Sequence, residues 1–152
     1  MSNYDKLDIE IMKLLQKDGR MSFRELGKEL DRPESTIRAR YNNLVEKGIL
    51  RIVAIATPNL IGLNIMAMVF IKVAIENFDD AVKTIREFSE VRFIAYTSGV
   101  YDLIVELYVK DTEEIVDFMT NKLSKVPGIK EYDLSFELKL FKDSYEWVRD
   151  DI

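Results

Sequence analysis

The chain has 152 residues, 47% of them hydrophobic, so it is long enough to bury one or two apolar cores. It has no cysteine and no histidine, which excludes disulfides, thiolate nucleophiles, zinc sites built from these residues and imidazole acid–base catalysis. The net charge of -5 is unevenly divided: residues 1–51 hold 11 Lys and Arg against 9 Asp and Glu, and residues 52–152 hold 11 against 18. The composition predicts a globular protein with a basic first part that is not an enzyme and has no metal or cofactor.

No segment has the length and the apolar character of a membrane span. The longest mostly apolar stretch, residues 61–75, is short and is interrupted by Asn64 and Lys72. No basic segment leads into an apolar one at the start of the chain, as a secretory signal would require. We therefore expect a soluble cytoplasmic protein without a membrane partner.

The first 51 residues show the pattern of three short helices. Apolar residues in 4–16 recur every three or four positions, which predicts an amphipathic helix. Ser22 and Glu25 have the spacing of a capping box, so a second helix begins directly after Ser22. A third helix starts near Pro33, which suits a first helical turn, and ends at Gly48. A break of only three or four residues between the second and third helices indicates a helix-turn-helix.

The outward face of the third helix is suited to double-stranded DNA. Its residues are small, polar or cationic: Ser35, Thr36, Arg38, Ala39, Arg40, Asn42 and Asn43. A helix in the major groove needs small side chains for close approach, Arg for guanine or phosphate, and Asn for adenine. From this pattern alone, two other interpretations stay open: an ordinary solvated helix face, and a three-helix domain that binds no DNA.

The remainder of the chain alternates between strand and helix patterns. Residues 49–56 read as a strand that leads into a linker. Further strands are predicted at 66–75, 92–98, 102–109 and 132–140, and helices at 78–88 and 112–123. The order strand, helix, strand, strand, helix, strand is the ferredoxin-like βαββαβ arrangement. The predicted fold is therefore α+β, with a helix-turn-helix domain at 1–51, a strand and hinge linker at 52–62, and a ferredoxin-like domain at 63–152.

One face of the predicted sheet lacks a cover. The two helices protect one face only, yet strand positions on the other face include Phe70, Ile104, Tyr108 and Phe141. Such a face is too apolar to remain in water, and an identical sheet is an economical cover for it. The pattern predicts at least a homodimer.

Seven short motifs, in order, resemble the Lrp/AsnC family of transcription regulators over nearly the whole chain. They are Asp5-x-x-Asp8, Asp18-Gly19-Arg20-x-Ser22, Ser35-Thr36-Ile37-Arg38-x-Arg40, Glu46-Lys47-Gly48, Pro58-x-x-x-Gly62, Ser98-Gly99-Val100-Tyr101-Asp102 and Pro127-Gly128-Ile129. The resemblance implies a DNA-binding domain, an effector and oligomerisation domain, dimers that assemble into octamers, and a response to amino acids.

The resemblance also implies two sets of site residues. The DNA-binding set is Arg20, Ser22, Ser35, Thr36, Arg38, Arg40 and Asn43. The family's conserved Arg falls on Arg40, and Ser35, Thr36 and Arg38 are expected on the same exposed side. Arg20 and Ser22, at the start of the second helix, are expected to contact phosphate. The effector-binding set is Thr97, Ser98, Gly99, Tyr101 and Asp102, where Asp102 would pair with an ammonium group.

Other interpretations of these features stay open. Gly99 and Asp102 also fit an ordinary hairpin turn without a ligand. Tyr132 and Leu134 stand where the family often has hydroxyl residues that complete the effector pocket, so the ligand is expected to differ or to be absent. The alternative function is a metabolite-binding module whose N-terminal helices mediate protein contacts.

Overall fold

The computed structural model describes residues 4–149, which divide into two compact units. The helical unit comprises the described residues up to Ile55 together with residues 141–149, and the sheet unit comprises Ala56–Leu140. The sequence pattern instead placed everything after residue 62 in one domain. The structure differs because residues 141–149 contact the first helix rather than prolonging the last strand.

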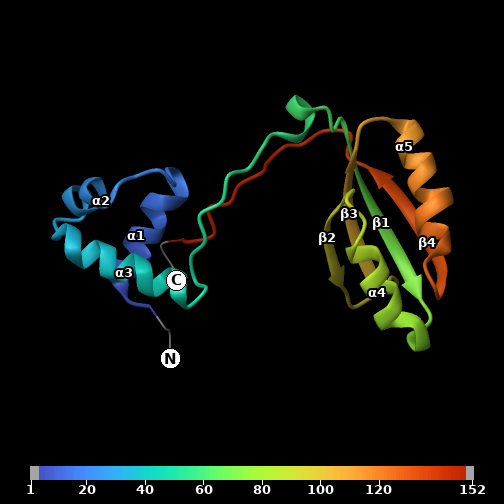
Figure 1. The fold of residues 1–152 in the computed structure, drawn as a ribbon, viewed down its shortest axis with the longest axis horizontal. Helices are drawn as coiled ribbons and strands as arrows, with labels where there is room; N and C mark the ends of the chain where they lie inside the picture. Colours follow the sequence, from blue (N-terminus) through green and yellow to red (C-terminus); the bar gives the residue numbers. More distant parts are fainter. Residues whose placement is uncertain (1–3, 150–152) are drawn as a thin grey trace. The chain divides into compact units, whose positions relative to one another are not determined.

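The helical unit contains three helices, α1 (Lys6–Lys17), α2 (Phe23–Glu29) and α3 (Glu34–Glu46) (Figure 1). The predicted capping box of α2 is present, because the Glu25 N–H donates to the Ser22 hydroxyl and the Ser22 N–H donates to the Glu25 carboxylate. Gly48 follows α3 with a positive φ of 69°, as expected of a residue that ends a helix. The core is formed by Ile11, Met12, Leu15, Leu26, Ile37, Leu44 and Leu50.

The sheet unit has four antiparallel strands in the order β2-β3-β1-β4, and two helices (Figure 1). The strands are β1 (Ile65–Val73), β2 (Val91–Tyr96), β3 (Leu103–Val109) and β4 (Ile129–Phe136). The helices are α4 (Phe78–Arg86) and α5 (Thr112–Asp117), and α5 continues as a π-helical turn (Phe118–Lys122) and a 3-10 turn (Leu123–Lys125). This order confirms the predicted ferredoxin-like fold.

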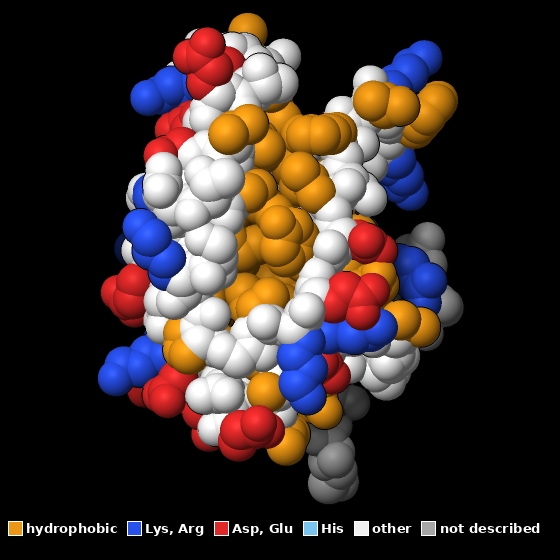
Figure 2. Space-filling model, turned by 90° about the vertical axis from the view of Figure 1, so that its right-hand side faces the viewer, with side chains coloured by type: hydrophobic (Ala, Val, Ile, Leu, Met, Phe, Trp, Pro, Cys, Tyr) orange, Lys and Arg blue, Asp and Glu red, His pale blue; other side chains and the backbone are white. Residues whose placement is uncertain are grey.

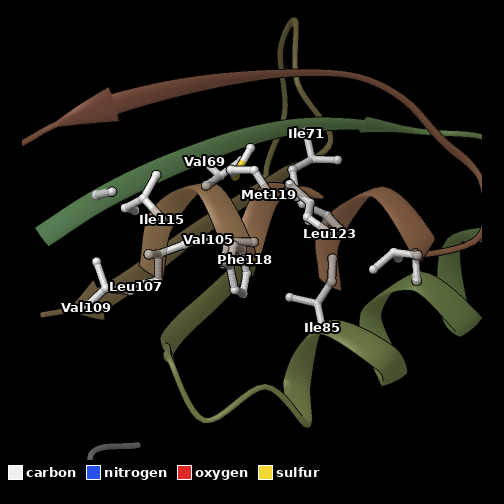
Figure 3. Close-up of a cluster of buried hydrophobic side chains, with 14 of the residues drawn as sticks. Val69, Ile71, Ile85, Val105, Leu107, Val109, Ile115, Phe118, Met119 and Leu123 are labelled. Atoms are coloured by element: carbon white, nitrogen blue, oxygen red, sulfur yellow. The ribbon is translucent and has the colours of Figure 1, made fainter. Parts of the chain in front are cut away.

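The core of the sheet unit lies between the sheet and its two helices. Alternate residues of β1 and β3 are fully buried, as expected of strands with one face covered. Figure 3 shows Val69, Val105 and Leu107 pointing toward Phe118, which has no exposed surface. The Phe118 ring meets the Phe88 ring edge to face at 5.5 Å. Large apolar side chains from the strands and helices therefore form one buried core between the sheet and the helices.

Strand β4 is an edge strand, and it leaves an apolar strip beside α5. Tyr132 and Phe136 share the helix-covered face with Leu134, yet they are 43% and 44% exposed. Figure 2 views the molecule from the right of Figure 1, where α5 and β4 lie, and shows a patch of hydrophobic side chains bordered by backbone and by non-hydrophobic side chains. One side of β4 thus combines an unpaired backbone with apolar side chains.

Two predicted strand segments are not strands. Residues 50–57 form neither helix nor strand, because no strand pairs with them within residues 4–149. The last strand ends at Phe136 rather than at residue 140, because its neighbour β1 begins at Ile65 and the final ladder contact is the Glu137 N–H donating to Met66. Phe141 is consequently not on the open sheet face, whereas Phe70, Ile104 and Tyr108 are.

Candidate functional site

The exposed side of α3 carries several of the predicted polar residues. Ser35, Arg38, Ala39 and Asn42 are all exposed, and their spacing of three or four residues puts them on one side of the helix. Asn43 borders this side and is exposed, while Thr36 is half-buried. We call this side, from Ser35 to Asn42, the α3 polar face.

Arg38 is held in place on the α3 polar face without being buried. Its Nη2 lies 2.7 Å from a Glu34 carboxylate oxygen one turn earlier, and its guanidinium lies 4.7 Å from the centre of the Phe23 ring. The Phe23 ring in turn packs edge to face on Tyr41. Arg38 is therefore a preoriented cation at the surface, close to the start of α2.

Arg20 and Ser22 both precede α2, but the Arg20 side chain is exposed whereas that of Ser22 is held by hydrogen bonds. The Arg20 side chain is 96% exposed, with a loose 3.9 Å contact to Asp18. The Ser22 hydroxyl and the Ser22 N–H both donate to the Glu25 carboxylate, and these two bonds lower the pKa of the Glu25 carboxyl. The Ser22 hydroxyl also accepts the Glu25 N–H. Ser22 is therefore committed to capping α2, and of the two only Arg20 can reach toward an anion unhindered.

Arg40 does not lie on the α3 polar face. Its Nη1 is 2.6 Å from the Asp5 carboxylate and 3.4 Å from the Asp8 carboxylate, so it joins α3 to the start of α1. The Asp8 side chain is only 6% exposed and that of Arg40 is 37% exposed. The two carboxylates raise the pKa of the Arg40 guanidinium. In this structure Arg40 supports the helical unit, rather than extending toward solvent as expected for a DNA contact.

Gly27 sets the distance between α2 and the turn that leads to α3. A Cβ atom added at this position would lie 2.6 Å from the Arg32 carbonyl oxygen, which is backbone and cannot rotate away. We expect Gly27→Ala to lower the free energy of unfolding by about 1–3 kcal/mol, because the turn must move to relieve the clash. Urea unfolding measures this, with Gly19→Ala as the control, since a Cβ there meets only ordinary contacts at 3.6 Å. Equal stability of the two variants would contradict the tight approach.

Residues 97–102, which we call the effector loop, are tied together by their own hydrogen bonds. The Thr97 N–H donates to the Asp102 carbonyl oxygen, and the Thr97 hydroxyl donates to the Tyr101 carbonyl oxygen at 2.8 Å. Gly99 has φ of 134°, which an L side chain rarely adopts. Ser98 and Gly99 are exposed at the tip of the loop. The loop thus presents backbone at its tip while its two ends are fixed.

Asp102 anchors this loop to β1. Its carboxylate accepts the Val73 N–H at 2.9 Å, and its own N–H donates to the Ile71 carbonyl oxygen. The side chain is half-buried. In this structure Asp102 therefore makes a structural contact at the position where the sequence suggested a partner for a ligand's ammonium group.

The anchoring role of Asp102 predicts a stability effect that does not depend on a ligand. Asp102→Ala removes the acceptor of a buried N–H, so we expect the free energy of unfolding to fall by about 2 kcal/mol. Asp102→Asn keeps an acceptor oxygen and should lose less. Urea unfolding followed by circular dichroism compares the two variants. Wild-type stability in Asp102→Ala would show that the Val73 contact contributes nothing.

Tyr101 connects the effector loop to β4 on the open face of the sheet. Its hydroxyl donates to the Asp133 carboxylate, which raises the pKa of Tyr101 to about 12. Its ring lies 5.9 Å from the Phe70 ring and 5.4 Å from the Lys72 ammonium group. Lys72 also pairs with Glu131 at 2.8 Å. The loop is thus bordered by alternating charges from β1 and β4.

The residues of β4 that face the effector loop differ from those that the sequence indicated. Tyr132 and Leu134 pair with Ile71 and Val69 and share their helix-covered face, so they point away from Tyr101. Asp133, on the opposite face, is the residue that meets the loop. Lys72 and Asp133 were missed because the register between β1 and β4 decides which side of each strand they occupy.

Residues 4–149 contain neither a metal-binding cluster of carboxylates nor a membrane-spanning helix. No group of three or more Asp or Glu side chains there is placed to hold a metal ion. No helix in that range has the length and hydrophobicity needed to cross a membrane.

Two parts of the chain match models of known protein families. Residues 4–51 match a family model described as winged helix-turn-helix DNA-binding, and residues 66–147 match the Lrp/AsnC ligand binding domain. The two matches define a transcriptional regulator with a DNA-binding part and a ligand-binding domain, not an enzyme. The chain belongs to the Lrp/AsnC family of transcriptional regulators.

Relatives and solved structures agree with this assignment. An uncharacterized HTH-type transcriptional regulator of Pyrococcus horikoshii is 34% identical over 145 residues, which are 95% of this chain and 92% of that protein. A crystal structure of a Neisseria meningitidis transcriptional regulator in complex with L-Met has a TM-score of 0.89 at 24% identity, covering 95% of this chain and 96% of that one. Escherichia coli AsnC has a TM-score of 0.88 at 20% identity, covering 95% and 99%. At these identities the two structures support the fold alone.

Proposed function

We propose that this regulator binds a specific operator in double-stranded DNA as a homodimer or higher assembly in the cytoplasm, and that an amino acid or related small metabolite modulates the binding. The α3 polar face is the observation that carries the DNA part of the proposal. It presents the small residues Ser35 and Ala39, the oriented cation Arg38 and the amide Asn42 on one side of the second helix of a helix-turn-helix.

The contacts that these residues make in the structure support a different role on DNA for each of them. Arg38 is suited to a guanine edge or a phosphate, while Arg20, before α2, is suited to a phosphate. Asn43 lies beside the α3 polar face and is suited to the DNA backbone. Arg40 acts indirectly, because its ion pairs with α1 fix the position of α3.

The open face of the sheet supports the homodimer. Met66, Met68 and Phe70 of β1 and Ile104 and Tyr108 of β3 are all half-buried there, although no element of the sheet unit covers them. A second copy of this face would remove them from water. A dimer would also bring two helix-turn-helix units to two half-sites of one operator. Light scattering of the purified protein separates the dimer from the octamer that the family resemblance implies.

The effector loop supports the regulatory part. Its tip is exposed backbone held at both ends by Thr97 and Asp102, and charged residues of both signs, Lys72 and Asp133, lie beside Tyr101. A zwitterionic amino acid offers both charges that such a site would complement. The Neisseria meningitidis regulator of the same fold was crystallised with L-Met.

The proposal is tested by fluorescence anisotropy with labelled DNA from upstream of the protein's own coding region. We expect saturable binding that is tighter than to unrelated DNA, weakens with salt, and shifts with one of the twenty amino acids. Arg38→Ala should weaken specific binding by about tenfold, the loss typical of one side chain that contacts a base.

Lys83→Ala is the matched control for Arg38→Ala. Lys83 is an exposed residue of α4 in the sheet unit, so this variant removes the same charge without touching the α3 polar face. If both variants lose affinity equally, the effect is one of net charge and the assignment of the α3 polar face fails. If no amino acid shifts the binding, the amino-acid part fails while the DNA part stands.

A further inference from the structure

The segment that follows the sheet unit returns to the helical unit and binds there. The Gln16 side chain on α1 donates to the Tyr145 carbonyl oxygen at 2.7 Å and accepts the Val148 N–H at 3.1 Å. The Gln16 amide thus bonds both a backbone carbonyl and a backbone N–H of this extended segment, as the backbone of a neighbouring strand would. We call residues 141–149 the strap.

Apolar contacts accompany these hydrogen bonds. Val148 is half-buried and packs against the core of the helical unit. Tyr145, Trp147 and Val148 line a cavity of about 510 Å³ together with Met12 and Leu15 of α1 and with residues 49–53 after α3. The strap therefore lies against both α1 and the segment that follows α3.

The contact of the strap with α1 also affects how the helical unit is connected to the sheet unit. The helical unit is joined to the sheet unit once through residues 56–64 and again through residues 137–140, which separate β4 from the strap. Four residues span at most about 14 Å, so this second link is short. The three helices have one covalent link to the sheet unit, through residues 56–64, and a docked strap adds a second, non-covalent connection that an undocked strap lacks.

We propose that the strap is a second tether whose docking on Gln16 and the α1 surface sets the DNA affinity of the helical unit. This inference rests on the proposed DNA-binding function for its consequence, though not for the docking itself. With two tethers, the helix-turn-helix units of an assembly explore fewer orientations. The effective concentration of the second unit at its half-site is then higher.

The protein contains a built-in probe, because its single tryptophan, Trp147, lies on the strap and is 74% exposed. In the full chain, Val148→Asp places a charge against the core and should undock the strap. We expect acrylamide to quench Trp147 more strongly in this variant, and specific DNA affinity to fall by about tenfold. Gln16→Leu, which loses both hydrogen bonds at similar volume, should move both readouts in the same direction and serves if Val148→Asp does not fold.

Lys142→Gln is the control, since it changes the net charge by the same amount at an exposed position of the strap. Unchanged quenching in Val148→Asp and Gln16→Leu overturns the docking. Stronger quenching with unchanged affinity for specific DNA overturns the tether. If the wild-type protein shows no specific DNA binding, the proposed function and the affinity-setting role both fail, while the quenching result still decides whether the strap docks.

Discussion

Replacing Arg40 by Ala is expected to destabilise the helical unit rather than only to weaken its contact with DNA. The change leaves the carboxylate of Asp8, which is almost fully buried, without its cation. Removing one partner of a buried ion pair is costly, but Arg40 and Asp5 are partly exposed, so solvent screening lowers the loss to about 2 kcal/mol. Urea unfolding followed by the fluorescence of Trp147, which lies in the helical unit, measures it.

Two comparisons separate this role from DNA contact. Arg38→Ala should change stability little, since the Arg38–Glu34 pair is exposed. In the double variant Asp8→Ala/Arg40→Ala the loss should be smaller than the sum of the two single losses. Full stability of Arg40→Ala together with lost DNA binding would return Arg40 to the DNA surface.

The Arg40 effect should also depend on pH. The Asp8 N–H, followed by the hydrogen bond from Arg40, lowers the pKa of the Asp5 carboxyl in the folded protein, although burial opposes this. Stability from a lowered pKa is present above the unfolded value, near about 4, and is lost as the pH falls through the folded value. The difference between wild type and Arg40→Ala should therefore shrink below about pH 4.

Replacing Phe118 by Ala should cost more than any other single change considered for the sheet unit. Phe118 has no exposed surface and packs on Phe88 at the centre of the core. Truncating such a ring loses its transfer free energy and leaves a cavity, together about 4 kcal/mol. Urea unfolding followed by circular dichroism measures the loss.

Val116→Ala is the control for Phe118→Ala. Val116 belongs to the same α5 helix but is exposed, so its truncation should change stability by less than about 0.5 kcal/mol. A small loss for Phe118→Ala would mean that the π-helical turn it begins can collapse to fill the space.

The features that could be predicted from sequence are those decided within one element. The helices of the helical unit follow from apolar spacing and from the Ser22–Glu25 box, and the βαββαβ order follows from alternation along each strand. The partner of Arg40 could not be predicted in this way, because Asp5 and Asp8 lie more than thirty positions away. One signal was present, however: residues two apart in a helix point to opposite sides, so Arg38 and Arg40 do not share a face.

The ends of the strands, and the face on which each strand residue lies, could not be predicted without knowing the neighbouring strand and its register. Residues 52–55 are apolar and mostly β-branched, which is the composition of a strand, but no strand pairs with them within residues 4–149. Which of Tyr132 and Asp133 reaches the effector loop depends on the register of β4 against β1, and one position of slip would exchange them.

The return of the strap to Gln16 makes the helical unit discontinuous along the chain. During synthesis, residues 4–55 leave the ribosome first, whereas the strap follows only after the whole sheet unit. The three helices therefore lack the strap while β1 to β4 are being made. The last tertiary contacts of the helical unit form after those of the sheet unit have become available, so a chain interrupted after β4 would carry a helical unit without its final contacts.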